Sequence, residues 1–392
     1  MVVGMRWRRV PFLVVLGVAV HGCTNNHGSE STSASTSTTT ASTISATLDV
    51  AVEVPASTSV TPEPSVSVGW ERLPSGPWSG DTVGWTFSAM NADVLAYGPD
   101  GWYVIEVGAD EVRQTQPSPI NPRSGAATAW TGAEFLIWGG SERSSDAVET
   151  VQMSGAAYNP GSDTWRMLPA APLDVDSPKA VAWDGREMYV WDAVQGDQPA
   201  QLNDAAAYDP VADTWRPLGS RLPNANYEIV RSAEGTPPLL WLDQRDSTVP
   251  LYGTSNRLYS YDGNSDQWTA LDDSPLRGWS PAASVAGDTF TALGESRSPD
   301  AETLDLEAVT WTASGGWQNL PVPQLDTVPV CQTQVLAHGV DVVARRCTAV
   351  SVLHEGEWVR LERITDSARL LIAGSWLLSI DINRIDRLAI NT

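Results

Sequence analysis

The 392-residue sequence has few of the residues that usually supply positive charge and metal ligands. It contains one lysine, Lys179, with four histidines and three cysteines, and its formal net charge is −23 at pH 7. A surface this acidic repels nucleic acid and anionic lipid headgroups. The acidic residues are scattered along the chain, so they predict solubility rather than a binding stripe, and we expect no nucleic-acid partner.

The histidines do not suggest a metal site. His21 and His27 precede the part of the chain that we expect to fold, while His338 and His354 fall in two turns on one face of one sheet. No Cys, Asp or Glu stands beside them at ligand spacing. The stretch DGNSD (262–266) has the alternating oxygens of a calcium loop but lacks the downstream glutamate, which favours a plain turn. We therefore predict no metal and no cofactor.

The N-terminus also lacks an apolar run long enough to span a bilayer. The apolar run Val10 to Val20 follows three arginines and is too short to span a bilayer, so residues 1–22 predict a secretory signal peptide. The run ends in VHGC, which resembles the lipobox of bacterial lipoproteins apart from His21. That resemblance implies lipidation of Cys23 and anchoring at the outer side of the cytoplasmic membrane, in the cell envelope. An ordinary secretory signal is the alternative.

Large apolar residues are nearly missing from the next segment as well. Ser, Thr, Pro and Val dominate residues 23–68. Such a composition cannot bury enough apolar surface to offset chain entropy, so we predict a disordered tether, which would also tolerate O-glycosylation. Residues 69–392 remain for the folded domain.

Phenylalanine is rare and tryptophan is common, with 4 Phe against 18 Trp. The stretch AAYNPGSDTWRMLP (156–169) recurs as AAYDPVADTWRPL (206–218), and the pattern W-x-x-L returns along the chain. Its copies start at Trp70, Trp165, Trp215, Trp268, Trp317 and Trp358, with Val112 in the tryptophan place of a seventh. A repeat of roughly 40 to 50 residues predicts a propeller or a solenoid.

Each repeat contains two hairpins. One hairpin leads into the tryptophan through a turn such as Asn159-Pro160 or Asp209-Pro210, and the other follows it through a turn such as Thr131-Gly132 or Asp184-Gly185. Two hairpins supply four strands, which make one propeller blade. The Ala- and Val-rich first strands suit a crowded central axis, and the tryptophan should pack between neighbouring blades.

The segment RSGAATAWTGAEFLIWGG (123–140), followed by AAYNPGSDTWRML, resembles a kelch repeat. The match is best over 123–218, and the later blades at 282–320 and 332–361 lack the glycine pair. The resemblance implies a propeller like that of galactose oxidase. The copper centre of that enzyme needs two histidines, tyrosines and a cysteine, and the sequence offers no such set.

The two ends of the repeat region complement each other. GWERLP (69–74) is a fourth strand with no blade before it, and residues 368–391 supply three strands with no fourth after them. We predict that the N-terminal strand completes the last blade and closes the ring. The fold class is therefore all-β, a single propeller of seven blades, or six if Val112 is wrongly counted.

Two cysteines remain once Cys23 is assigned to the lipobox. Cys331 and Cys347 suit a disulfide in an oxidising compartment. Counting outward from a turn at 337–339 places position 331 opposite about 345, with Cys347 just beyond. We predict a Cys331–Cys347 disulfide.

The links between blades should share one face near the central channel. They include 121–125, 174–178, 224–227 and 277–280. Candidate binding residues on these links are Arg123, Asp176, Tyr227 and Trp279, because arginine and aromatic residues are common at binding hot spots. Two alternatives stay open: kelch repeats often carry an inward-pointing structural arginine at the position of Arg123, and Trp279 would also fill a gap between blades.

The sequence contains no nucleophile elbow, phosphate loop or HExxH motif. We therefore expect a monomeric, surface-anchored propeller that binds a protein or a glycan without catalysis. The alternative is an extracytoplasmic carbohydrate-active enzyme of the mutarotase, epimerase, lyase or oxidase type, because fold alone does not decide function. A cluster of arginines and carboxylates with displaced pKa values at the channel mouth would favour the enzyme.

Overall fold

The computed structural model describes most of the chain beyond residue 68. The described residues are 69–76, 84–143, 149–173, 180–191, 205–220, 227–231, 236–245, 254–276, 279–297, 304–323, 325–326, 333–338, 341–354, 356–381 and 384–390. Contacts group residues 65–392 into one unit. The predicted Cys23, Asp176 and Cys331 lie outside the described residues.

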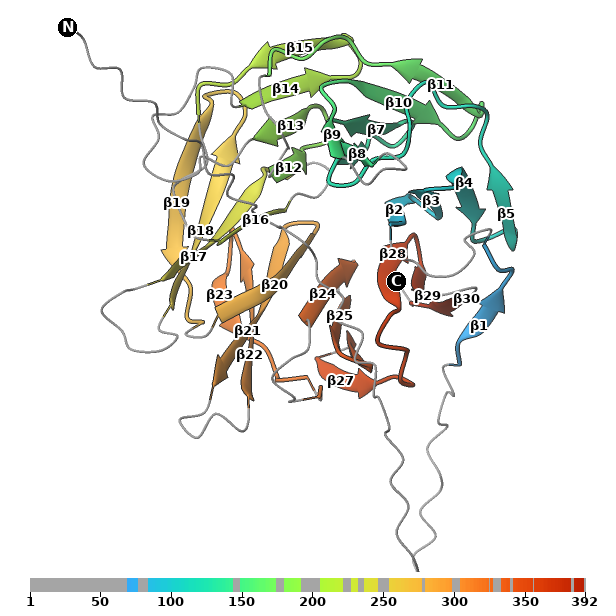
Figure 1. Ribbon diagram of the computed structural model, residues 1–392. Coiled ribbons are helices and arrows are strands. Elements are labelled where there is room, and N and C mark those ends of the chain that lie inside the picture. The colour runs from blue at the N-terminus through green and yellow to red at the C-terminus, as the bar shows by residue number, and fades with distance from the viewer. Residues whose placement is uncertain are drawn as a thin grey trace, which may run out of the picture. The chain divides into compact units, whose positions relative to one another are not determined.

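Seven four-stranded antiparallel sheets follow one another around a ring, as predicted for a seven-bladed β-propeller (Figure 1). Blades I to III comprise β2 (Thr86–Met90), β3 (Asp93–Gly98), β4 (Gly101–Glu106) and β5 (Glu111–Gln114); β6 (Ala127–Trp130), β7 (Phe135–Trp138), β10 (Gly155–Asn159) and β11 (Thr164–Met167); and β12 (Ala180–Trp183), β13 (Met188–Trp191), β14 (Ala205–Asp209) and β15 (Thr214–Pro217). Blade II also carries a two-stranded arm of β8 (Ser141–Arg143) and β9 (Glu149–Val151).

The remaining blades repeat the same order of strands. Blades IV to VI comprise β16 (Tyr227–Arg231), β17 (Leu239–Arg245), β18 (Thr254–Asp262) and β19 (Gln267–Asp273); β20 (Trp279–Ala286), β21 (Thr289–Arg297), β22 (Leu304–Thr312) and β23 (Gly316–Asn319); and β24 (Thr333–His338), β25 (Asp341–Arg346), β26 (Ala349–His354) and β27 (Glu357–Arg360). Blade VII comprises β28 (Arg369–Ala373), β29 (Trp376–Asp381), β30 (Arg384–Ala389) and β1 (Glu71–Leu73).

The closure of the ring follows the sequence prediction. β1 pairs antiparallel with β30, with Arg72 opposite Asp386, so the N-terminal strand becomes the outermost strand of the last blade. The Nε of Arg72 lies 2.7 Å from the Asp386 carboxylate. Val112 occupies β5 opposite Ile105, which confirms the seventh blade.

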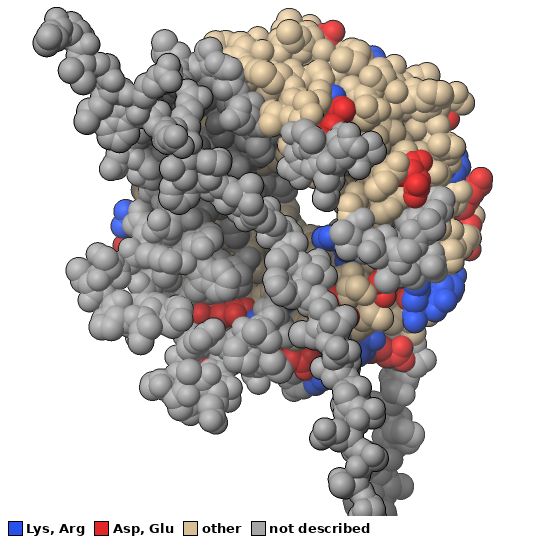
Figure 2. Space-filling model, viewed as in Figure 1, with Lys and Arg blue, Asp and Glu red and all other residues tan. Residues whose placement is uncertain are grey.

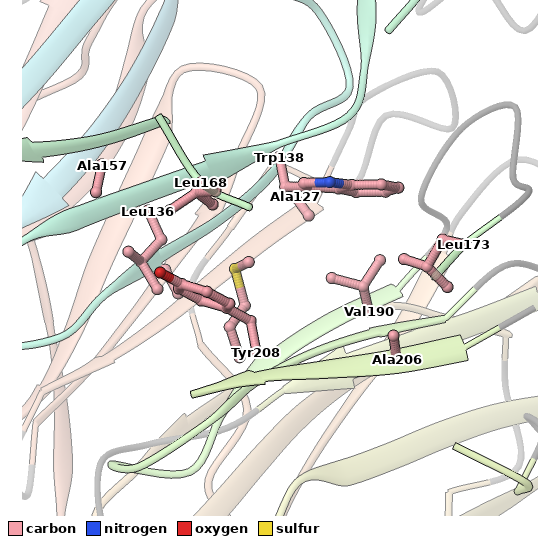
Figure 3. Packing of buried hydrophobic residues seen from close by; sticks show 11 residues of the cluster. Ala127, Leu136, Trp138, Ala157, Leu168, Leu173, Val190, Ala206 and Tyr208 are labelled. Atoms are coloured by element: carbon pink, nitrogen blue, oxygen red, sulfur yellow. The ribbon is translucent and has the colours of Figure 1, made fainter. Parts of the chain in front are cut away.

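The tryptophans of the outermost strands pack between blades, again as predicted. Figure 3 shows the cluster between blades II and III, where the side chains of β6 and β7 meet those of β13 and β14. Four of these indoles donate a hydrogen bond to a backbone carbonyl of the preceding blade or of the link that follows it. The pairs are Trp165 to Gln116 (3.1 Å), Trp215 to Pro169 (3.1 Å), Trp317 to Asp272 (3.0 Å) and Trp358 to Pro321 (2.7 Å).

An aspartate repeats in the turn between the third and fourth strands. Asp110, Asp163, Asp213 and Asp266 have φ between 51° and 57°, the left-handed region that aspartate tolerates better than most residues. Its carboxylate accepts a hydrogen bond from the tyrosine five residues earlier in three blades, as in Tyr208 to Asp213 at 2.6 Å. Residues 263–266 form one of these turns, in the stretch 262–266 where a turn was predicted.

One predicted register differs. In the first hairpin of blade VI, His338 lies opposite Asp341 and Thr333 opposite Arg346, so the strand β24 extends further than the predicted turn at 337–339 allowed. Each residue of β24 therefore lies opposite a residue three positions later on β25 than predicted.

Candidate functional site

The propeller has two faces, which we name by their turns. The turns between first and second strands and between third and fourth strands lie on the hairpin face. The turns between second and third strands, and the links between blades, lie on the other, which we call the link face. The link face of blade II carries the arm formed by β8 and β9.

Arg123 anchors that arm. Its side chain is 2% exposed, and its Nε lies 3.2 Å from the Glu142 carboxylate on β8. Its two terminal nitrogens donate to the Ser154 carbonyl at 2.6 Å, the Gly139 carbonyl at 3.3 Å and the Ser154 hydroxyl at 3.0 Å. Burial lowers the pKa of the guanidinium, and the charge of Glu142 offsets part of that shift. The geometry is that of a positioning residue that ties the link to the arm.

The glycine pair of blade II makes this packing possible. Gly139 and Gly140 have φ of 71° and 80°. A Cβ on Gly140 would lie 2.7 Å from the Ser124 carbonyl oxygen, which is closer than real Cβ atoms approach. Glycine is required here because the arm passes directly over the link.

The other predicted binding residues are only partly placed. Tyr227 is the first residue of β16 and Trp279 the first of β20, so both backbones lie where an innermost strand begins at the link face, in neighbouring blades. Asp176 lies outside the described residues. A shared binding site for Arg123, Asp176, Tyr227 and Trp279 stays a prediction.

A groove opens at the outer rim between blades I and II. Gln116, Pro117, Ser118 and Pro119 of the link that leaves blade I form one wall, and the other is the turn and outermost strand of blade II, 163–167. Its volume is about 570 Å³. We call it the rim groove.

Hydrogen bonds across the rim groove fix its walls. The Trp165 indole donates to the Gln116 carbonyl at 3.1 Å, and the Gln116 backbone N–H donates to the Asp163 carboxylate at 3.2 Å. Partial burial raises the pKa of Asp163, but hydrogen bonds from Tyr158 and Gln116 and the charge of Arg113 outweigh it and leave the pKa lowered. Asp163 is therefore ionised at neutral pH.

Blade II also exposes more apolar side chains than its neighbours. Val151 on β9, Met153 after it and Met167 on β11 are 42%, 48% and 49% exposed. They account for half of the six large apolar side chains that stand out as exposed among the described residues. Met167 is itself part of the rim groove.

Most of the described arginines are engaged in ion pairs within the structure, while many carboxylates remain in excess. Arg346, fully buried, binds Glu295 across blades V and VI, and Arg363 holds Asp326 through two contacts of 2.8 and 3.0 Å. Figure 2 shows acidic and basic side chains interspersed on the face in view. The pKa of Asp93 is raised, first by burial and then by the charge of Glu106. Asp93 begins the second strand of its blade and therefore lies on the hairpin face.

One of the two blade VI histidines, His354, contacts a carboxylate. His354 Nδ1 lies 3.0 Å from the Asp341 carboxylate, and Asp341 pairs across the hairpin with the backbone of His338. No group of three metal-ligating side chains forms among the residues that the structure describes. In the same part of the chain no helix is long and apolar enough to span a membrane.

Sequence reasoning missed the rim groove. The available signal was the contrast between TWRM (164–167) and TWRP (214–217), two otherwise matching outermost strands. That contrast becomes informative only once the strands are known to lie at the edges of their sheets.

Comparisons with known proteins show no family for this chain. No family model matches the chain, and no curated protein matches it. A solved structure described as "Structure of YjhT" is similar over 80% of this chain and 99% of that one, with 16% sequence identity and a TM-score of 0.45. The class that fold and sheet order define is a seven-bladed β-propeller.

Proposed function

We propose that this chain is a surface-anchored, extracytoplasmic β-propeller of the kelch type that binds a protein partner without catalysis. The observation that carries the proposal is the rim groove of blade II, with preformed walls and the exposed side chain of Met167 at its edge. The VHGC sequence at 20–23 supports the lipid anchor, and the Ser/Thr-rich residues 23–68 support a spacer.

The chemistry of the groove suits a polypeptide. Pro117, Pro119, Trp165 and Met167 supply apolar contact, while Asp163 supplies one ionised acceptor. Apolar side chains around a few fixed polar groups are typical of binding sites, and preformed walls lower the entropy cost of association.

Site-specific photo-cross-linking tests this proposal. A photoreactive amino acid replaces Met167 in the anchored protein in intact envelopes, and the matched control replaces Pro217, the equivalent residue of blade III. We expect a discrete protein adduct from position 167 that is absent at position 217. Identical adducts at both positions, or none at 167, would contradict the proposal.

The link-face prediction has its own test. A glycan array is probed with the wild-type protein and with the Arg123→Ala, Trp279→Ala double variant. Glycan binding that the folded double variant loses would move the functional site to the link face and make the ligand a carbohydrate. If the folded variant binds every glycan as the wild type does, the link face is the wrong place to look.

A further inference from the structure

The outermost strands of the seven blades differ at one exposed position. This position lies two residues after the repeat tryptophan, or after Val112 in blade I. In chain order of the strands it holds Arg72, Gln114, Met167, Pro217, Ala270, Asn319 and Arg360, and all seven are exposed. Met167 is the one large apolar residue among them.

The other residues at this position match the ways in which proteins protect a sheet edge. An outermost strand presents unpaired backbone groups to any passing chain, and charged side chains and proline are the usual protection. Arg72 and Arg360 supply charge, and Pro217 removes an N–H. Met167 offers an apolar side chain instead, 49% exposed, beside a groove.

At Met167 the backbone N–H and C=O of β11 point away from β10. The N–H of Leu168 bonds to the Gly155 carbonyl of β10 at 2.9 Å, and Met167 lies opposite Ala156. Hydrogen-bonded pairs alternate along an antiparallel ladder, so Arg166 and Thr164 bond to β10 while the N–H and C=O of Trp165 and Met167 face away from it. β11 pairs with β10 alone.

We propose that β11 is a docking strand: an extended segment of a partner protein pairs with its free edge and becomes a fifth strand of blade II. The side chains on one face of that segment lie in the rim groove, against Pro117, Pro119 and Met167. Main-chain hydrogen bonds give such a complex its affinity, and alternate side chains give it specificity. This inference rests on the proposed protein-binding function and names the partner's conformation.

Charge complementarity defines the partner segment further. The net charge of −23 favours a cationic segment, although the Asp163 carboxylate at the groove is already paired with Arg113 at 3.2 Å. Arg166, the groove's own cation, already holds Glu134 at 2.6 Å and Asp213 at 3.0 Å, so its charge is compensated. The occupant is therefore an extended segment in which basic and apolar residues alternate.

Blade III supplies a matched control from the chain itself. β15 has the same sequence as β11 except for Pro217 in place of Met167, and its register with β14 is the same. Leu218 donates to Ala205 just as Leu168 donates to Gly155. Proline is thus compatible with the fold at this position, and Met167→Pro removes the outward N–H without changing the net charge.

The probe is an octapeptide that alternates lysine and valine, and its binding to the full-length protein is followed by fluorescence anisotropy. We expect Met167→Pro to weaken binding about tenfold or more, and Pro217→Met to add a second site. A peptide with proline at alternate positions should not bind. Because Met167→Pro keeps the charge of the protein, general attraction of a cationic peptide to an acidic surface affects wild type and variant equally.

Amide hydrogen exchange distinguishes strand pairing at β11 from protein binding at the rim groove in general. In the wild-type complex we expect slower exchange at the Trp165 and Met167 amides, with no change at Trp215. Equal peptide binding by wild type and Met167→Pro, or unchanged exchange at both amides, would overturn the docking strand. If position 167 still cross-links to a protein in envelopes, the binding function survives that failure; if it does not, both proposals fall.

Discussion

Arginine is the residue that joins neighbouring blades in this molecule. The Arg166 guanidinium binds Glu134 of its own blade and reaches Tyr208 and Asp213 of the next, at 3.0 Å each. Arg113 makes the same contacts to Tyr158 and Asp163. With so few basic residues, most of the described arginines are engaged in the structure, and the surface is left acidic.

Arg123 should be much more important for stability than an exposed arginine. Arg123→Ala leaves Glu142 and the Ser154 carbonyl without their buried partner, so the free energy of unfolding should fall by about 3 kcal/mol. Arg186→Ala is the control, because Arg186 is 72% exposed and 3.9 Å from Asp209. Denaturant unfolding measures both. Equal losses would contradict a structural role for Arg123.

Tyrosine ionisation should limit stability in alkali. Burial raises the pKa of Tyr97, Tyr158 and Tyr208 to about 12, from 10.0, and the neighbouring Asp163 adds to the shift at Tyr158. A raised pKa favours the neutral form in the folded state, so this stability is complete below pH 10 and is lost as pH rises toward 12. Ultraviolet titration should show these tyrosines ionising late, together with unfolding. Complete ionisation near pH 10 in folded protein would be the opposite result.

The Cys331–Cys347 disulfide remains a prediction of the sequence. Cys347 occupies the turn between β25 and β26 with φ of 49°, and Cys331 lies outside the described residues. The closed loop is short, so the bond should add about 3 kcal/mol at most. Mass spectrometry of secreted protein without reductant should find the linked peptides. Two free thiols would refute the bond.

At the scale of the element, the outermost strand holds adjacent blades together. Its tryptophan reaches a carbonyl near the end of the previous outermost strand, as Trp215 does to Pro169. Trp70 and Trp268 are the exceptions among the described repeat tryptophans, because their buried indole N–H groups have no hydrogen-bond partner.

This difference predicts unequal effects of one substitution. Trp215→Phe removes the donor to the Pro169 carbonyl, while Trp268→Phe removes an N–H that bonds to nothing described. Trp215→Phe should therefore cost about 1–2 kcal/mol more than Trp268→Phe. Parallel denaturant titrations measure the difference. A larger loss at Trp268 would show that the indole hydrogen bond is not what matters.

At the scale of the whole molecule, the ring depends on one short strand. β1 pairs with β30 through Glu71, Arg72 and Leu73, and Leu73 joins the buried cluster between blades VII and I. Arg387 of β30 extends this seam through Glu71 at 3.0 Å and through Asp110 of blade I.

Deletion of residues 69–74 should open the ring and lower the melting temperature sharply, because it exposes the edge of β30 and removes Leu73 from the core. Deletion of residues 24–68 is the control and should leave the melting temperature unchanged. Scanning calorimetry compares them. If the variant without residues 69–74 melts like the parent, closure by β1 does not stabilise the ring.

Much of this architecture is local in sequence and was predictable for that reason. A hairpin needs only alternating residues and a turn such as Asp184-Gly185, and the tryptophan repeat counts the blades. Even the closure followed from an unmatched strand at each end. The role of Arg123 was left open, because the sequence does not say whether an arginine on a link points inward to Ser154 or outward to a ligand.

The sequence by itself determined the class of fold and the partner of β1, because both depend on periodicity and on the count of strands, and it left six or seven blades open until the structure placed Val112 on β5. Only the tertiary structure decided which surfaces are open to a binding partner. Met167 and Pro217 occupy the same place in their repeats, yet the rim groove lies beside Met167, where a link from blade I and an edge of blade II meet. Such a surface depends on contacts between residues about fifty positions apart, as in Trp165 and Gln116. Local patterns do not encode those contacts.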